Sequence, residues 1–158
     1  MGHFEFEMES PLPRDKLYAW YTDFSEQDSE LSQKYGNGTL LARHVRRTDD
    51  GHIICEQRLK IGRLEIPGQI RVLLHPENFT YDAELDFGNI VHQNRQYIFL
   101  EKDGHTLVRV KVEYTPKAWF VKALNAVGMY KRIDLRESRR TMDGYFKAAE
   151  AEIGGPAA

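Results

Sequence analysis

Residues 4–9 alternate strictly between apolar and polar side chains, and a helical pattern follows them directly. Strict alternation predicts a half-buried strand, because successive side chains of a strand point to opposite faces. Pro13 suits the first turn of a helix, where a missing N–H leaves no bond unmade. We therefore predict a strand and then an amphipathic helix over residues 11–24. The large apolar residues of that helix fall on one face, which should pack under a sheet: Leu17, Trp20, Tyr21 and Phe24.

The first hairpin is predicted by Asp50-Gly51, which lies between two alternating segments, residues 40–48 and 52–61. Asp-Gly favours a two-residue turn. That turn would place Arg46 opposite Cys55 and His44 opposite Gln57. Cross-strand partners share a face, so His44 and Gln57 would line the same side of the sheet. A short helix over residues 26–31 and a loop at residues 36–38 are expected before this hairpin.

A second turn, over residues 75–78, would pair Leu74 with Phe79 and Val72 with Tyr81. The strand that follows it is half-buried, because acidic residues alternate with an apolar set: Phe79, Tyr81, Ala83, Leu85 and Phe87.

A third turn, at Asp103-Gly104, would pair Tyr97 with Val110 and Arg95 with Val112, and also Gln93 with Tyr114. Valines alternate with charged residues on the last strand, so the valine face is the inner one. Tyr97 and Arg95 are therefore predicted to point inward.

One long helix is expected over residues 117–153, with Met142 and Phe146 among the residues of its apolar face. Its opposite face is cationic: Lys131, Arg132, Arg136, Arg139 and Arg140. We favour a solvated surface for this face, because Asp134 and Glu137 dilute its charge. The alternative is a patch for anions or lipid headgroups near a cavity mouth.

The composition is typical of a soluble globular protein, with 41% apolar and 29% charged residues among 158. We expect one domain over residues 1–153 and a disordered tail over 154–158. A net charge of −2 gives no global reason to expect nucleic acid or an anionic membrane as partner. The single Cys55 fits a reducing, cytoplasmic compartment. Without a run of about 20 apolar residues, no integral membrane segment is predicted. No metal site or cofactor is predicted, since the histidines lack ligand spacing.

The order of these elements resembles the helix-grip superfamily, which includes START-type lipid-binding domains, Bet v 1-like allergens and polyketide cyclase/dehydrase-like proteins. The resemblance rests on the opening strand, the proline-rich cap Pro11-Leu12-Pro13 and the helix that closes with Asp23-Phe24, and it extends along nearly the whole chain. It implies an α+β fold, in which a seven-stranded curved antiparallel sheet wraps around a long C-terminal helix. Two short helices would follow the first strand, and a cavity would separate sheet and helix.

The candidate ligand-binding residues are those assigned to the concave face. The polar ones are His44, Gln57, Tyr81, Arg95, Tyr97 and Tyr114, and the apolar walls include Phe79, Leu85, Phe87, Val110 and Met142. A buried arginine is costly unless it is paired, so Arg95 should meet either an internal partner or a polar group of a ligand. A register slip would instead leave Arg95 on the sheet surface, beside Glu113 or Asp86.

Three functions fit this constellation. The favoured one is binding or transport of a hydrophobic small molecule such as a lipid, quinone or polyketide. The second is a polyketide cyclase/dehydratase, with His44 and Tyr97 as the acid–base pair and Arg95 stabilising an enolate. The third is a protein-interaction module that uses Trp119, Phe120 and Leu124. We assign no catalytic residue. Binding is favoured because, unlike catalysis, it does not require particular side chains to meet, and the sequence alone does not show which ones do.

Overall fold

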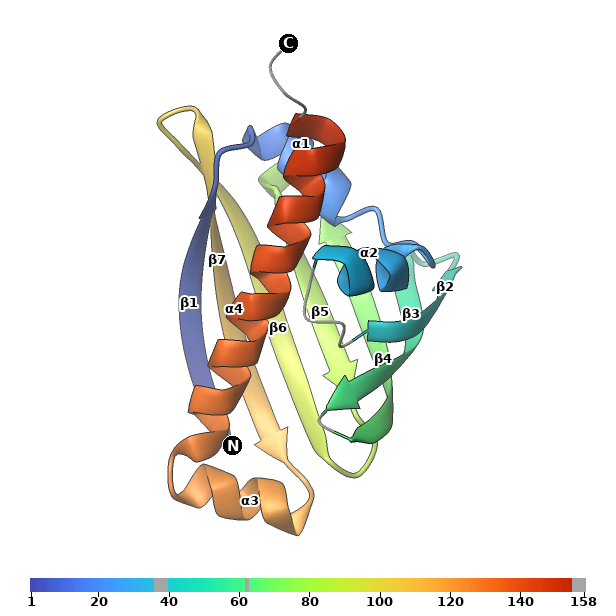
Figure 1. The fold of residues 1–158 in the computed structure, drawn as a ribbon, viewed down its shortest axis with the longest axis vertical. Helices are drawn as coiled ribbons and strands as arrows, with labels where there is room; N and C mark the ends of the chain where they lie inside the picture. Colours follow the sequence, from blue (N-terminus) through green and yellow to red (C-terminus); the bar gives the residue numbers. More distant parts are fainter. Residues whose placement is uncertain (36–39, 62, 155–158) are drawn as a thin grey trace.

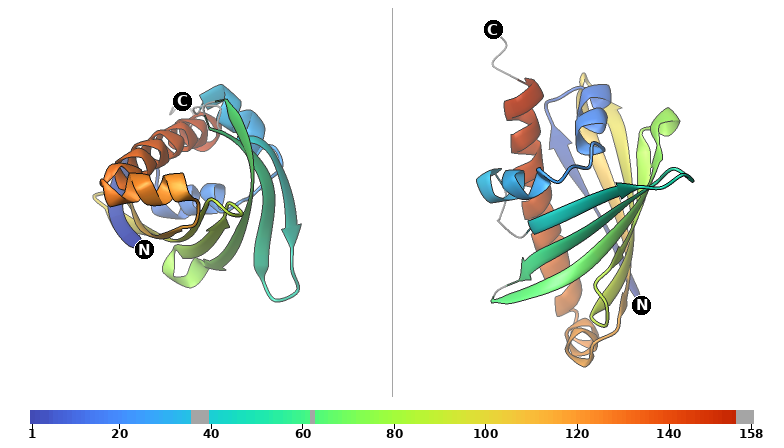
Figure 2. Two further views of the ribbon diagram at one scale, coloured as in Figure 1. Left: turned by 90° about the horizontal axis from the view of Figure 1, so that it is seen from below. Right: turned by 90° about the vertical axis from the view of Figure 1, so that its right-hand side faces the viewer.

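A computed structural model describes residues 1–35, 40–61 and 63–154 of the chain (Figure 1). One antiparallel sheet curves around a long helix, which lies across its concave side (Figure 2). The strands follow the order β1-β7-β6-β5-β4-β3-β2 across the sheet. Their bounds are β1 Gly2–Ser10, β2 Leu40–Arg47, β3 His52–Ile61, β4 Leu64–His75, β5 Thr80–Asp86, β6 Val91–Lys102 and β7 His105–Pro116. This arrangement confirms the predicted fold class.

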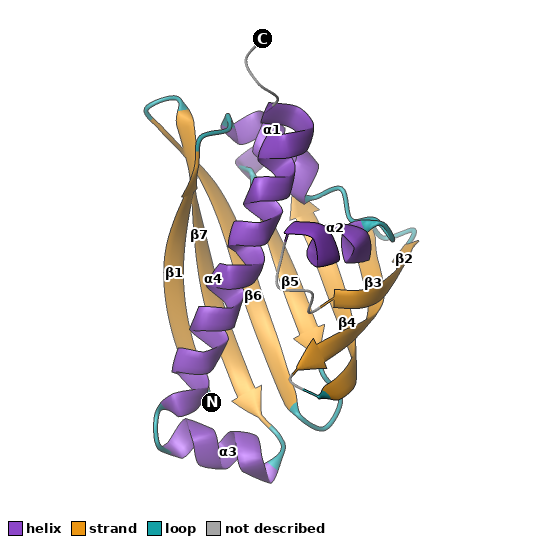
Figure 3. Ribbon diagram, in the orientation of Figure 1, coloured by secondary structure: helices purple, strands orange, loops and turns teal. Residues whose placement is uncertain are grey.

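The helices all lie on the concave side or at the ends of the sheet (Figure 3). They are α1 (Arg14–Tyr21), α2 (Asp28–Tyr35), α3 (Trp119–Ala126) and α4 (Met129–Ala149), with a 3-10 turn η1 (Pro76–Asn78) and a π-helical turn η2 (Glu150–Gly154). Pro13 directly precedes α1, as its missing N–H predicts. No described helix combines the length and the apolar composition needed to cross a bilayer.

The prediction of a single helix over residues 117–153 is wrong. Gly128 has a φ of 75°, a left-handed conformation that glycine adopts without steric cost, and it separates α3 from α4. The short helix predicted over residues 26–31 is instead α2, which lies further along the chain. The predicted loop at residues 36–38 lies outside the described residues, as do residues 155–158 of the predicted tail.

The β2–β3 register differs from the predicted one by one residue. Arg43 pairs with Gln57 and Val45 with Cys55. The cause is the turn: the Thr48 amide donates to the His52 carbonyl at 2.9 Å, so three residues, not two, form the loop. Because side chains alternate along a strand, this shift turns His44 to the outer face and Arg43 to the inner one.

The β4–β5 register differs from the predicted one by two residues, with Leu74 opposite Tyr81. Phe79, at a φ of 52°, belongs to the turn and not to the strand. A two-residue shift preserves the faces, so Tyr81 and Leu85 remain buried as predicted.

The β6–β7 register is the predicted one, with Tyr97 opposite Val110 and Arg95 opposite Val112. Asp103 and Gly104 both have positive φ, as the two-residue turn requires. The predicted inner face of β7 is also confirmed, since Val110 is fully buried.

Candidate functional site

A cavity of about 1170 Å³ lies between the concave face of the sheet and α4. Strands β2 to β6 and all four α-helices contribute to its lining. Small-molecule sites typically occupy roughly 300–1,000 Å³ and have mostly apolar walls with a few polar groups. This cavity is slightly larger than that range, and its walls are likewise mostly apolar with a few polar groups. It therefore has room for a ligand of several fused rings or a long chain.

The predicted wall residues divide into two groups. Leu85, Phe87 and Met142 line the cavity. Val110, on β7, does not line it and is fully buried in the core. Phe79 does not line it either. Its ring packs edge-on against the ring of Tyr18 on α1, with 5.6 Å between the ring centroids.

Stacked tyrosines form one wall of the cavity. The rings of Tyr81 and Tyr97 lie 4.4 Å apart and only 12° from parallel. Tyr21 packs beside both of them, and Tyr145 lies 5.9 Å from Tyr21. Burial raises the pKa of Tyr21 and of Tyr81 well above 10, so both phenols stay protonated.

Three of these tyrosines have hydroxyl groups that the protein leaves available. Within the described part of the chain, no hydrogen bond joins the hydroxyl of Tyr21, Tyr81 or Tyr145 to another residue, and all three residues line the cavity. A phenol hydroxyl that is kept neutral is a hydrogen-bond donor. These groups can therefore donate to oxygen atoms of a ligand inside the cavity.

Arg95 points into the cavity, as predicted, and is paired internally. Its Nη2 donates to Asp134 Oδ1 at 3.0 Å, its Nη1 to Ser138 Oγ at 3.0 Å and its Nε to Gln93 Oε1 at 2.9 Å. Burial alone would lower the pKa of Arg95, but Tyr97 and Asp134 raise it above its ordinary value. Arg95 is thus a buried, permanently charged group. The surface pairing with Glu113 or Asp86 does not occur.

Gln93 and Tyr130 complete this cluster. Gln93 Nε2 donates to Asp134 Oδ2 and to the Tyr130 hydroxyl, both at 2.7 Å. The cluster joins β6 to α4 by hydrogen bonds, so it fixes the helix over the sheet as well as shaping the cavity.

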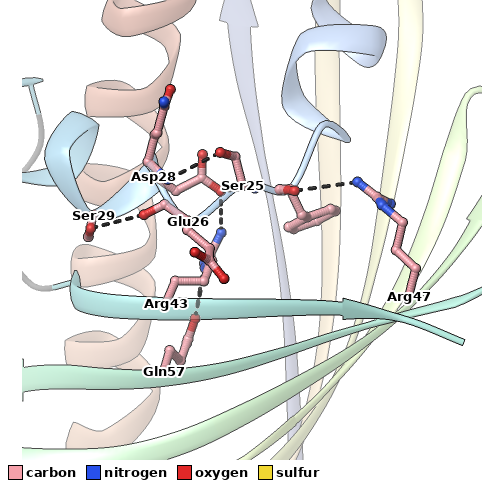
Figure 4. A network of polar contacts seen from close by, with 9 residues as sticks. Ser25, Glu26, Asp28, Ser29, Arg43, Arg47 and Gln57 are labelled. Atoms are coloured by element: carbon pink, nitrogen blue, oxygen red, sulfur yellow. Dashed lines mark hydrogen bonds and ion pairs between the residues drawn. The ribbon is translucent and has the colours of Figure 1, made fainter.

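A second arginine, Arg43, lines the cavity from β2 (Figure 4). Its Nη1 donates to Asp28 Oδ2 at 2.6 Å, and its Nη2 donates to Gln57 Oε1 at 3.0 Å. Burial opposes the charge of Arg43, but Tyr145 and Asp28 outweigh it and raise the pKa of the guanidinium. Burial also raises the pKa of Asp28, despite the neighbouring Arg43. Gln57 thus lines the cavity as predicted, while Arg43 and Asp28 were missed.

Two of the predicted polar site residues, His44 and Tyr114, also lie outside the cavity lining. His44 is on the outer face of β2, where its side chain is 70% exposed and its Nδ1 lies 2.8 Å from Glu26 Oε1. The proposed acid–base pair of His44 and Tyr97 therefore does not form, because only Tyr97 reaches the cavity. Tyr114 is buried behind the wall, where its hydroxyl donates to Asn125 Oδ1 at 2.7 Å.

No protein-family model and no curated protein sequence matches the chain. Solved structures do match it. TTHA0849 from Thermus thermophilus is 13% identical, with a TM-score of 0.79 over 96% of this chain and 99% of that one. The Zhui aromatase/cyclase from Streptomyces sp. R1128 is also 13% identical, with a TM-score of 0.77 over 99% of both chains. The chain has the helix-grip fold.

A third helix-grip structure supports the same assignment. Norcoclaurine synthase from Thalictrum flavum, in complex with dopamine and hydroxybenzaldehyde, is 14% identical, with a TM-score of 0.63 over 96% of this chain and 87% of that one. At these identities the likeness establishes the fold alone. Within the described residues, no cluster of histidine, cysteine or acidic side chains is placed to hold a metal ion.

Proposed function

We propose that this helix-grip protein binds a hydrophobic small molecule that carries oxygen groups, and that the cavity between sheet and α4 is its site. The observation that carries the proposal is the set of available hydroxyls on Tyr21, Tyr81 and Tyr145 in an otherwise mostly apolar cavity. A saturated acyl chain would leave these donors without partners, which costs free energy. A quinone or a polyketide has both the apolar area and the carbonyl or hydroxyl oxygens.

The shape of the tyrosine wall favours a flat ligand. The rings of Tyr81 and Tyr97 stack nearly parallel, and aromatic groups pack well against such a surface. Arg43 and Arg95 add positive charge on two sides of the cavity, although their own hydrogens are largely taken by protein oxygens. They would therefore act on a ligand chiefly by attracting electron-rich oxygens. Two fold neighbours, an aromatase/cyclase and a norcoclaurine synthase seen with dopamine and hydroxybenzaldehyde, support a ligand with aromatic character.

The cyclase/dehydratase alternative is weaker, because its acid–base pair has no structural basis. His44 lies on the outer face of β2 beside Glu26, so it does not meet Tyr97 in the cavity. A proton-transfer group must lie within hydrogen-bond reach of the reacting atom, and His44 is outside the cavity. We therefore propose binding without assigning a catalytic residue.

Titration with 1-anilinonaphthalene-8-sulfonate, an aromatic probe with an anionic oxygen group, tests the proposal. Tyr81→Phe removes an available hydroxyl inside the cavity, so we expect its Kd to rise by about five-fold, equivalent to about 1 kcal/mol. Tyr114→Phe is the matched control, since that hydroxyl already bonds Asn125 outside the cavity lining. It should lower stability slightly and leave the Kd unchanged. Equal effects of the two variants on the Kd would refute the assignment of the cavity.

A further inference from the structure

Most of the exposed large hydrophobic side chains of the described residues lie on α3 or shortly after it: Trp119, Phe120, Val127, Met129 and Ile133. The others are Met1 and Ile153 near the ends of the chain and Leu64 at the start of β4. Trp119 is 80% exposed and Val127 70% exposed. We call Trp119, Phe120, Val127, Met129 and Ile133 the α3 patch. Contiguous exposed apolar side chains of this kind mark an interaction surface.

The packing of α3 does not account for the patch. Val121, on the inner face of α3, is buried, and Asn125 accepts the Tyr114 hydroxyl bond. The outer face therefore has no partner within the described chain. The exposed positions of α3 are all apolar except one: Trp119, Phe120, Lys122, Ala123 and Ala126. A helix face that meets only water is normally polar, so this face is built to meet something else.

The charged residues of the chain segment that carries most of the patch all have one sign, although Lys117 at its start pairs with Asp86. Residues 117–133 include Lys117, Lys122, Lys131 and Arg132 and no aspartate or glutamate. Within the part of the chain that the structure describes, no ion pair involves Lys122, Lys131 or Arg132. Further along α4, Arg140 pairs with Glu137 and Lys147 with Asp143. With a net charge of −2 for the whole chain, this segment is a local concentration of positive charge.

The patch also adjoins an opening of the cavity. Phe120 and Ile133 both line the cavity and are exposed to solvent, so they lie at its rim. Leu64, at the start of β4, lines the cavity and is exposed in the same way. Helix α3 lies at the end of the molecule opposite α1 (Figure 1), so the patch can meet a flat surface without obstruction from the rest of the fold.

We propose that the α3 patch docks on the surface of an anionic lipid bilayer. Protruding tryptophan and aliphatic side chains insert at the boundary of headgroups and acyl chains, and each nearby lysine or arginine adds about 1 kcal/mol on an anionic surface. The α3 patch supplies the apolar side chains for insertion, and Lys122, Lys131 and Arg132 supply the positive charge. Docking there would bring the cavity opening to the membrane, so a hydrophobic ligand could pass between the two without crossing water. This last step rests on the proposed function, whereas the docking itself does not.

Co-sedimentation with vesicles tests the docking. We expect the wild-type protein to sediment with vesicles of mixed phosphatidylcholine and phosphatidylserine, to remain in solution with phosphatidylcholine alone, and to dissociate as salt is added. Trp119→Ser combined with Val127→Ser should weaken binding by more than about ten-fold. Lys122→Gln should weaken it by roughly five-fold, and Lys16→Gln, on α1 at the opposite end, should leave it unchanged.

The outcomes separate the docking from the ligand site. Trp119 and Val127 do not line the cavity, so their double variant should bind 1-anilinonaphthalene-8-sulfonate as the wild type does. Failure of the wild type to bind mixed vesicles would overturn the docking and leave the cavity assignment intact. A wild-type dimer in solution that dissociates in the double variant would assign the patch to a second copy of the chain, and this too would overturn the proposal.

Discussion

The cavity contains two arginine clusters of the same chemical kind. Arg95 is held by Asp134 and Gln93, and Arg43 is held by Asp28 and Gln57. The arginine side chains are almost equally buried, at 10% and 9% exposure. They differ in what they connect. Arg95 joins β6, inside the sheet, to the long helix α4, while Arg43 joins the edge strand β2 to the short helix α2. The Arg95–Asp134 pair should thus stabilise the whole fold, whereas the Arg43–Asp28 pair should stabilise mainly the peripheral helix α2.

The largest expected effect is that of Asp134→Ala. It leaves Arg95 as a buried charge without its counterion, which should lower the free energy of unfolding by about 3–5 kcal/mol. Urea unfolding measures this. Asp143→Ala, further along the same helix, is the control, because the Asp143–Lys147 pair is exposed and should contribute less than about 1 kcal/mol. Similar losses in the two variants would show that Arg95 does not need its partner.

Asp28→Ala should have a smaller effect on global stability, about 1–3 kcal/mol. Helix α2 is short and lies at the sheet edge, so it can move away and let water reach Arg43. We expect amide hydrogen exchange to accelerate in α2 and β2 and to stay unchanged in β6 and β7. A loss as large as that of Asp134→Ala, with exchange accelerated across the whole sheet, would remove the distinction between the two clusters.

The Asp28 cluster should also respond to acid in a defined direction. Burial raises the pKa of Asp28 in the folded protein above its ordinary value of 3.8, so the folded state binds this proton more tightly than the unfolded state does. The contribution to stability is therefore present below the unfolded pKa and is lost as pH rises through the folded pKa. Relative to Asp28→Asn, the wild type should gain stability as pH falls from 7 toward 4. A relative loss over that interval would contradict the burial of Asp28.

The smallest effect is expected from deletion of Asp49. Thr48 would still pair with His52, now across a two-residue Asp50-Gly51 turn, which is a favoured hairpin loop. Stability should change by less than about 1 kcal/mol, and Arg43 should stay in the cavity. A change in the β2–β3 pairing, detected by NMR contacts between Arg43 and Gln57, would show that Asp49 itself fixes the register.

The two clusters also show which parts of the site the sequence could predict. The position of Arg95 on the inner face was predicted correctly because Asp103-Gly104 forms a two-residue turn. The length of a turn fixes which residues of the next strand point to each face of the sheet. Arg43 was missed because Asp49 joins the loop at Asp50-Gly51, and nothing in the local sequence distinguishes a two-residue from a three-residue loop there. The prediction of the fold did not depend on this difference. A one-residue shift in the β2–β3 register leaves the order of strands and helices unchanged.

The counterions could not have been found in the same way. The sequence pattern places Asp134 on a solvated helix face and Asp28 in a short helix with no predicted partner. Both meet their arginines only because helices pack against the concave face, which is a tertiary arrangement that local patterns do not specify. The break at Gly128 was missed for a related reason, since a single glycine inside a helical pattern is tolerated in many helices.

Native mass spectrometry of the purified protein, with denaturing extraction of whatever it carries, tests the central claim most directly. Ala83 lines the cavity on β5, so Ala83→Trp would fill part of it. We expect the wild type to retain one apolar molecule containing oxygen and the folded Ala83→Trp variant to retain none. An empty wild-type protein, or an equal amount of the same molecule on both proteins, would contradict it.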